Sequence, residues 1–92
     1  MTQIQVDNKK ETGDKFIFSV TIQDEDSQSN HEVTVDKDYY QKLTNGKNSA
    51  KNLVKRSFKF LLERESKEMI LSRFNLKVIQ DYFSNYEDKV KQ

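Results

Sequence analysis

The sequence predicts a small α+β domain in which strands come first and helices follow. Residues 15–23 alternate apolar and polar side chains with the period of two that is typical of a strand. From residue 50 onward, the apolar side chains recur instead at the three-and-four spacing of a helix. Because the two patterns occupy separate parts of the chain, we expect a short antiparallel sheet with three to four C-terminal helices packed on one face.

A β-hairpin is the clearest local prediction. Its first strand is KFIFSVTIQ, residues 15–23, and its second is the shorter alternating run EVTV at residues 32–35. The polar segment 24–31 between them predicts a loop of about eight residues. Ile4 and Val6 predict a third strand at an edge of the sheet. In the first strand, four apolar side chains share the face that needs a cover: Phe16, Phe18, Val20 and Ile22.

After Val35 the apolar pattern changes to that of helices. Asp36 is a suitable N-cap for a short helix that ends at Asn45-Gly46, where glycine can adopt a left-handed conformation. Ser49 then begins the principal helix, residues 50–64. Its apolar stripe consists of Ala50, Leu53, Val54, Phe58, Leu61 and Leu62.

The segment that follows the principal helix leaves two interpretations open. A break near Glu65-Ser66 would let Ser66 cap a new helix, whereas i,i+4 charge pairs across this point would support one continuous helix. Asn75 predicts the N-cap of the last helix, with Phe74 and Ile79 forming a hydrophobic staple. Its expected inward face contains Leu76, Ile79, Tyr82, Phe83 and Tyr86.

Length and composition favour one folded domain over residues 1–92, with residues 1–14 and 88–92 partly flexible. Apolar and charged residues each make up 34% of the chain, a balance that would suit a disordered protein. However, six Phe and four Tyr are distributed along the chain and the net charge is only +1. We therefore expect a small core beneath a heavily charged surface.

Several classes of protein and site are excluded or disfavoured by what the sequence lacks. Without cysteine, neither a disulfide framework nor a thiolate metal site can form. No apolar run approaches the roughly 18 residues of a membrane span, and the first 15 residues lack the apolar segment of a signal peptide. We therefore expect a cytoplasmic protein with no membrane partner.

Catalytic patterns are absent, and the sequence predicts a protein that is not an enzyme and uses no cofactor. His31 is the only histidine and falls at the end of the expected hairpin loop, where an exposed side chain is the simplest interpretation. Gly13 and Gly46 are isolated, whereas a phosphate-binding loop needs several glycines. The acidic run 24–26 resembles a hard-cation site, but it lacks the glycine and distal glutamate of an EF-hand, so a soluble hairpin tip is favoured.

The most informative functional feature is the polar face of the principal helix. Residues 1–46 carry a net charge of −4 and residues 47–92 a net charge of +5, and the positive charge concentrates between residues 47 and 64. The candidate binding residues are Lys47, Lys51, Lys55, Arg56 and Lys59. A row of cations can bind phosphates, or it can simply keep an amphipathic helix solvated.

Phe60 completes the candidate surface, because it lies off the apolar stripe and beside cationic positions. An exposed Phe60 would stack a base or seat a protein partner, and the alternative is that it packs under the last helix. Tyr39 and Tyr40 raise the same question, and we expect one to point inward and the other to lie at the rim.

A family resemblance covers residues 15–88. The stretch SFKFLLERESKEMILSRFNLKVIQDYFSNYED, residues 57–88, resembles the C-terminal signature S-F-x-F-L-L-x-R-E-x-x-E-x-I-L-x-x-F-x-L-x-V-I-x-x-Y-F of a group of short prokaryotic proteins. The resemblance implies a compact domain and supplies no activity. Arg64, Glu65 and Glu68 fall on charged positions of the signature, which implies a charge cluster that fixes the turn after the long helix.

Two functional expectations follow from the sequence. The first is a small non-catalytic interaction module that binds a protein partner or itself. The second is a nucleic-acid-binding domain that uses the basic helix face. A basic strip with Phe60 exposed would favour nucleic acid, and a patch broken by acidic side chains would favour protein.

Overall fold

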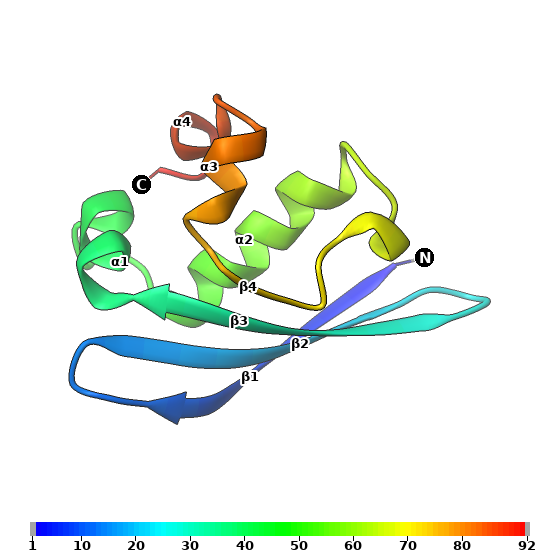
Figure 1. Ribbon diagram of the computed structural model, residues 1–92, viewed down its shortest axis with the longest axis horizontal. Helices are drawn as coiled ribbons and strands as arrows, with labels where there is room; N and C mark the ends of the chain where they lie inside the picture. Colours follow the sequence, from blue (N-terminus) through cyan, green and yellow to red (C-terminus); the bar gives the residue numbers. More distant parts are fainter. Residues whose placement is uncertain (1, 92) are drawn as a thin grey trace.

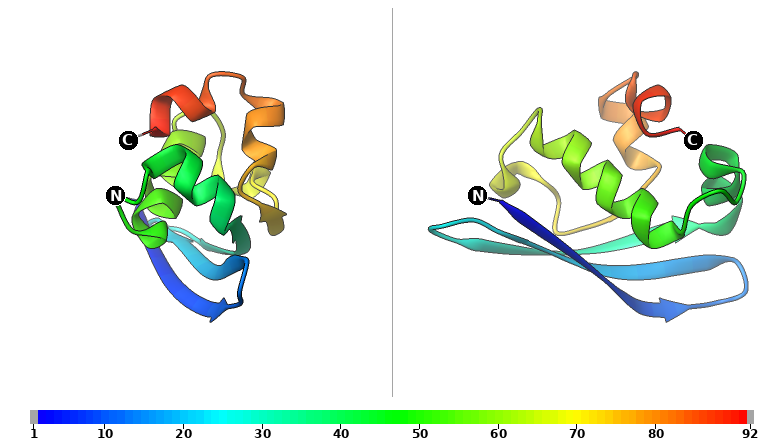
Figure 2. Two further views of the ribbon diagram at one scale, coloured as in Figure 1. Left: turned by 90° about the vertical axis from the view of Figure 1, so that its left-hand side faces the viewer. Right: turned by 180° about the vertical axis from the view of Figure 1, so that it is seen from behind.

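The computed structural model describes residues 2–91 and has the predicted α+β fold. Strands β1 (Gln3–Glu11), β2 (Lys15–Gln23) and β3 (Gln28–Asp36) form an antiparallel meander, and β4 (Arg73–Asn75) joins β3 in parallel. The order across the sheet is β1-β2-β3-β4, so β1 is one edge. The helices all lie on one face of the sheet, and the other face is open (Figures 1 and 2).

The helical layer contains one long helix and several short ones. Helix α2 lies across the sheet and the other elements flank it (Figure 1). The radius of gyration is 12.5 Å, close to the ~12 Å expected for a single compact domain of this length. The helical elements are α1 (Lys37–Thr44), α2 (Ala50–Leu62), the 3-10 turn η1 (Lys67–Met69), α3 (Val78–Tyr82) and α4 (Tyr86–Val90).

The core forms where the inward face of the sheet meets α2. Phe18, Val20 and Ile22 of β2 are at most 2% exposed, as the alternating pattern predicts. The stripe of α2 covers them and is equally buried at Leu53, Val54 and Phe58. Each such side chain contributes roughly 1.5–3 kcal/mol by leaving water. These residues are the predicted sheet face and its predicted cover.

Two strands are longer than predicted. β3 begins at Gln28, so the hairpin loop contains only residues 24–27, and the polar residues that follow belong to the ladder, where His31 pairs with Val20. β1 extends over residues 3–11, although we expected residues 1–14 to be partly flexible. In both cases cross-strand pairing extends a strand into a sequence of low strand propensity.

The predicted end of α1 and the predicted start of α2 are confirmed, whereas α2 ends at Leu62 rather than at residue 64. Asn45 and Gly46 follow α1 with φ of 52° and 75°, the left-handed conformation of a helix C-terminus. Ser49 caps α2, because its Oγ accepts a hydrogen bond from Asn52 N at 3.1 Å. Asp36 precedes α1 but its side chain does not cap it, since the carboxylate instead lies 3.3 Å from Lys77 Nζ.

The chain breaks after α2, and the single last helix predicted from Asn75 is wrong. Asn75 ends β4, and its Oδ1 accepts from Lys77 N at 3.1 Å in the turn that leads to α3. A second break separates α3 from α4, where Gln80 donates to Ser84 O at 2.7 Å and accepts from Glu87 N at 3.0 Å. Tyr82, expected inward, is therefore 71% exposed.

The two tyrosines of α1 are both half-buried, so the expected division into one inward and one rim residue is wrong. Tyr39 Oη donates to the Glu87 carboxylate at 2.8 Å, and Tyr40 Oη donates to Asn48 O. Burial and the neighbouring Glu87 carboxylate raise the pKa of Tyr39 far above its usual value. Both side chains thus serve as links between α1 and the segments around it.

Candidate functional site

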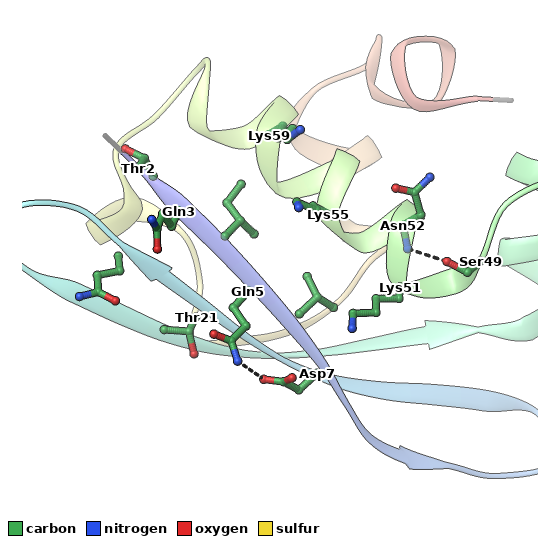
Figure 3. Close-up of a pocket in the computed structure, with 13 residues that line it drawn as sticks. Thr2, Gln3, Gln5, Asp7, Thr21, Ser49, Lys51, Asn52, Lys55 and Lys59 are labelled. Atoms are coloured by element: carbon green, nitrogen blue, oxygen red, sulfur yellow. Dashed lines mark hydrogen bonds between the residues drawn. The ribbon is translucent and has the colours of Figure 1, made fainter.

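The basic face of α2 is present as predicted. Lys51, Lys55 and Lys59 are exposed, and their i,i+4 spacing aligns them along one side of the helix. The geometry follows from the core, because the apolar stripe of α2 faces the sheet and leaves the lysines on a flank. Figure 3 shows the three side chains along the side of α2 that borders β1.

A hollow of about 930 Å³ separates this lysine row from the edge strand β1, and we call it the basic groove. One wall is the first part of β1, and the other is the beginning and middle of α2 (Figure 3). Thr21 and Gln23 of β2, the strand that pairs with β1, also line the groove. The remaining lining residues are Thr2, Gln3, Ile4, Gln5, Val6, Asp7, Ser49, Lys51, Asn52, Lys55 and Lys59.

The lysines of the basic groove have no acidic partner among residues 2–91. Elsewhere in that range, seven basic side chains form ion pairs with acids at 2.5–3.3 Å, such as Lys9 with Glu32 and Lys37 with Glu11. Asp7 is the carboxylate that lines the groove, and it accepts a hydrogen bond from Gln5 Nε2 at 3.1 Å. The groove therefore carries a positive charge that the described part of the protein does not neutralise.

The strand that faces the lysines has a free main-chain edge. β1 pairs with β2 on one side, and its other side borders no strand within the described residues. The pairing is regular from Gln3 to Asn8 and shifts register before Lys10. A bulge of this kind twists a strand edge away from further pairing. The regular stretch before it, residues 3–7, is the part of β1 that lines the groove.

Three other residues of the predicted surface do not line the basic groove. Lys47 is exposed in the turn between α1 and α2, where its N–H donates to Thr44 O at 2.9 Å. Arg56 is half-buried on a different side of α2, and its Nε has no hydrogen-bond partner in the described part of the chain. Phe60 is only 4% exposed, so its inclusion in the surface is wrong and the burial alternative is correct.

Phe60 is buried by the C-terminal helices. Its ring meets those of Phe83 and Tyr86 edge-on, at centroid distances of 5.8 and 5.3 Å. The Arg64 guanidinium covers the ring at 3.7 Å. Such edge-on aromatic pairs are each worth about 0.5–1.5 kcal/mol beyond burial. Phe60 is thus the residue on which α3 and α4 dock, and it is not available to a nucleobase.

His31 is also a structural residue, and the expectation of an exposed loop histidine is wrong. It is 5% exposed, and its Nδ1 lies 2.7 Å from Leu71 O. A carbonyl oxygen only accepts, so Nδ1 donates to it, and Nε2 shares a hydrogen bond of 2.9 Å with Ser29 Oγ. The ring therefore joins β3 to the segment before β4, and both nitrogens are engaged.

The acidic hairpin tip has a structural partner. Asp24 accepts hydrogen bonds from Lys67 Nζ at 2.7 Å and from two backbone N–H groups of the turn, Asp26 and Ser27. The pKa of Asp24 is lowered to about 2, and the hydrogen bond from Lys67 is the largest cause. Among the residues that the structure describes, no group of three or more potential metal ligands is found.

The charge cluster implied for Arg64, Glu65 and Glu68 does not form. Arg64 binds locally, donating to Phe60 O at 3.0 Å and to Glu63 at 3.3 Å. Glu68 instead accepts from Lys67 at 2.6 Å, so the pairs at this turn join it to the hairpin tip through Asp24. No helix in the described range is long and apolar enough to cross a membrane.

No family model, curated protein or solved structure matches this chain. The resemblance of residues 57–88 to a group of prokaryotic proteins therefore stays a prediction. The sequence predicted the three lysines and an edge strand at Ile4 and Val6, but it did not predict that the two face each other across a groove. No local signal could have found it, because the distance between β1 and α2 depends on how the sheet twists beneath the helix.

Proposed function

We propose that this protein is a non-catalytic interaction module that binds an extended acidic segment of a partner protein in the basic groove. The observation that supports this most directly is the combination of a free strand edge with three unpaired lysines across a single hollow. Each feature alone has a simpler explanation. Together they match the two requirements of strand addition, which are main-chain pairing and side-chain selection.

The strand edge supplies the main-chain half of recognition. An added segment would pair with residues 3–7, whose outward N–H and C=O groups make no described hydrogen bond outside the sheet. Natural edge strands are commonly protected by lysines and bulges. In β1 these protective features lie in the second half, at Lys9, Lys10 and the register shift. The first half lacks them.

The lysine row supplies the selection for acidic side chains. Lys51, Lys55 and Lys59 repeat every four residues of α2, which is about 6 Å along the helix axis. Alternate residues of an extended segment repeat at about 6.5–7 Å. Acidic side chains at alternate positions of a segment paired with β1 would therefore meet successive lysines.

Nucleic acid is the alternative occupant, because phosphates would also suit three lysines. Two observations favour peptide. Proteins that bind single strands stack the bases on aromatic side chains, and neither an aromatic residue nor an arginine lines the basic groove. Phosphodiesters also have no use for a row of free strand N–H and C=O groups, whereas a peptide pairs with them.

Self-association through the same edge is disfavoured by charge. If β1 of two copies paired about a two-fold axis, the lysine rows of both copies would face the same junction. Like charges across such an interface are unfavourable. Sedimentation equilibrium at high micromolar concentration tests this directly, and we expect a monomer.

The proposal is tested by fluorescence anisotropy with a labelled peptide that alternates glutamate with valine, beside the same peptide with lysine in place of glutamate. We expect the acidic peptide to bind, the basic one not to bind, and the affinity to fall as salt is added. Lys55→Glu should weaken binding on the order of tenfold at low salt. Lys89→Glu is the charge-matched control and should change binding little, because Lys89 is exposed on α4 and forms no ion pair among residues 2–91.

Main-chain pairing has its own test. Methylation of alternate backbone nitrogens in the acidic peptide removes the donors for one edge and leaves its charge unchanged. We expect the methylated peptide to lose most of its affinity if it pairs with β1. Unchanged affinity would show that the peptide binds through its charge alone and does not pair with β1. Tighter binding of oligothymidylate than of the acidic peptide, lost in Lys55→Glu, would assign the groove to nucleic acid.

A further inference from the structure

A second hollow, of about 350 Å³, lies where the end of α2 faces the segment from η1 to α3. We call it the apolar groove, and it shares no lining residue with the basic groove. Figure 1 shows the elements that border it, from the end of α2 through the yellow η1 turn to the orange α3. Its lining residues are Leu61, Glu65, Met69, Ile70, Leu71, Phe74, Val78, Ile79, Tyr82 and Phe83.

The exposed large apolar side chains of the described chain all line this groove. Met69 is 69% exposed, Leu71 is 51% exposed and Tyr82 is 71% exposed. They come from three different segments, namely η1, the loop before β4 and the end of α3. Clustered apolar exposure of this kind marks interaction sites, whereas single exposed apolar residues are ordinary. The side chains are also too exposed for a small ligand alone to cover them.

Glu65 gives the groove a charge. It is the charged residue of the lining, and its carboxylate makes no described hydrogen bond or ion pair. The nearby glutamates differ from it, since Glu63 pairs with Arg64 and Glu68 pairs with Lys67. An occupant that combines apolar side chains with one cation would therefore match the groove in both respects.

The backbone around the groove favours a helical occupant over an extended one. Its lining comes from helices and turns, and the strand edge nearby consists of the three residues of β4. The N–H groups of Met69, Ile70 and Ile79 are already bonded within their own turns. Recognition must then depend on side chains that insert into the groove, as when an amphipathic helix presents residues at three-and-four spacing.

We propose that the apolar groove is a second binding site, which accepts an amphipathic helix of a partner protein with a lysine or arginine placed to pair with Glu65. A second copy of this chain fits less well. Symmetric pairing of two grooves would oppose two Glu65 carboxylates, and the apolar face of α2, the longest helix, is already buried. The exposed Met69 adds an adaptable contact, as in other methionine-containing surfaces that bind helices.

The test uses two labelled peptides of about 15 residues, long enough to form a helix on binding. Both carry leucines at three-and-four spacing, and one has lysines beside that stripe where the other has glutamates. Anisotropy should show binding of the lysine peptide, and at least a several-fold weaker affinity for the glutamate peptide. Glu65→Gln should weaken the affinity for the lysine peptide several-fold. Leu71→Ser should weaken the affinity for both peptides several-fold.

Matched variants separate this site from a general surface effect. Glu63→Gln lies two residues from Glu65 and outside the groove, so it should leave the affinity unchanged. Lys55→Glu should also have no effect, which makes this inference independent of the basic groove. Equal binding of both peptides, no binding of either, or insensitivity to Glu65→Gln would each overturn the proposal. Sedimentation showing a dimer that Leu71→Ser dissociates would overturn it in favour of a second copy.

Discussion

The meander of β1 to β3 and the C-terminal segment, residues 66–91, are stabilised in different ways. The meander has nine-residue strands whose side chains alternate between its two faces. Its stability is distributed over many similar contacts. The C-terminal segment consists of pieces of three to five residues that are too short to be stable alone. Its buried apolar side chains, such as Leu76 and Ile79, join the core, and hydrogen bonds of Tyr86, His31 and Lys67 connect it to the rest of the molecule. Single substitutions should therefore affect the second region more than its size suggests.

Tyr86→Ala is the change from which we expect the largest effect. The side chain is 0% exposed, packs against Phe60, and shares a hydrogen bond of 2.6 Å with Ser57 Oγ. Its loss should lower the free energy of unfolding by about 3–5 kcal/mol, as for other large aromatic truncations. Urea denaturation measures this. Tyr82→Ala is the matched control, because Tyr82 is 71% exposed and its loss should cost less than about 0.5 kcal/mol.

These two tyrosines also show which features of the fold can be predicted from periodicity and which cannot. Tyr82 and Tyr86 are four residues apart, and periodicity places both on the inward face of one helix. The structure separates them because the chain breaks between α3 and α4, and this break depends on side-chain bonds of Gln80 to residues beyond it. By contrast, alternation along β2 depends only on neighbouring residues, so the buried positions of Phe18, Val20 and Ile22 could be predicted from it.

Contacts between distant segments explain the other errors. β4 has three residues and pairs with β3 across about 40 positions, so no pattern in the sequence marks it as a strand. The same holds for the candidate sites. The lysine row repeats within one helix and was predicted, whereas the facing edge of β1 and the apolar groove are assembled by the fold. Phe60 lies off the predicted apolar stripe because periodicity assigns α2 one buried side, while α3 and α4 cover another.

His31→Leu should have the next largest effect, because it cuts a link between the two regions. The change keeps the apolar contact with Phe58, whose ring lies 5.5 Å away, but leaves Leu71 O without its donor. The change also removes the contact of Nε2 with Ser29 Oγ, and each lost hydrogen bond costs roughly 0.5–1.5 kcal/mol. Hydrogen exchange should show where the structure is destabilised. The substitution should accelerate exchange of the backbone amides more in residues 71–76 than in β2. Uniform acceleration across both regions would show that they unfold as one unit.

A pH-dependent effect is expected at the second link, between Asp24 in the hairpin tip and Lys67 in η1. Because the pKa of Asp24 is lowered to about 2, below its value near 3.9 in an unfolded chain, its contribution to stability is complete above about pH 4. It is lost as the pH falls toward 2. Lys67 also lowers the pKa of Glu68, so both contributions depend on one ammonium group.

Lys67→Met removes that ammonium group and should flatten the fall in stability between about pH 4 and pH 2. Urea titrations at several pH values in this range measure the slope for both proteins. Asp24→Asn is the control that leaves Lys67 paired with Glu68, and it should flatten the slope only in part. An unchanged slope in Lys67→Met would show that other carboxylates govern acid unfolding.

The smallest effect on stability is expected for Lys55→Glu, and its sign is informative. Lys55 lies four residues from both Lys51 and Lys59, and like charges at this spacing destabilise a helix. Charge reversal replaces two repulsions by two attractions and should raise the free energy of unfolding by about 1 kcal/mol. The same change should abolish most of the binding to an acidic segment. If Lys55→Glu both stabilises the protein and weakens binding of the acidic peptide, the lysine row is explained by function rather than by folding. If Lys55→Glu instead destabilises the protein, the lysine row contributes to the fold, and its charge no longer supports a binding site in the basic groove.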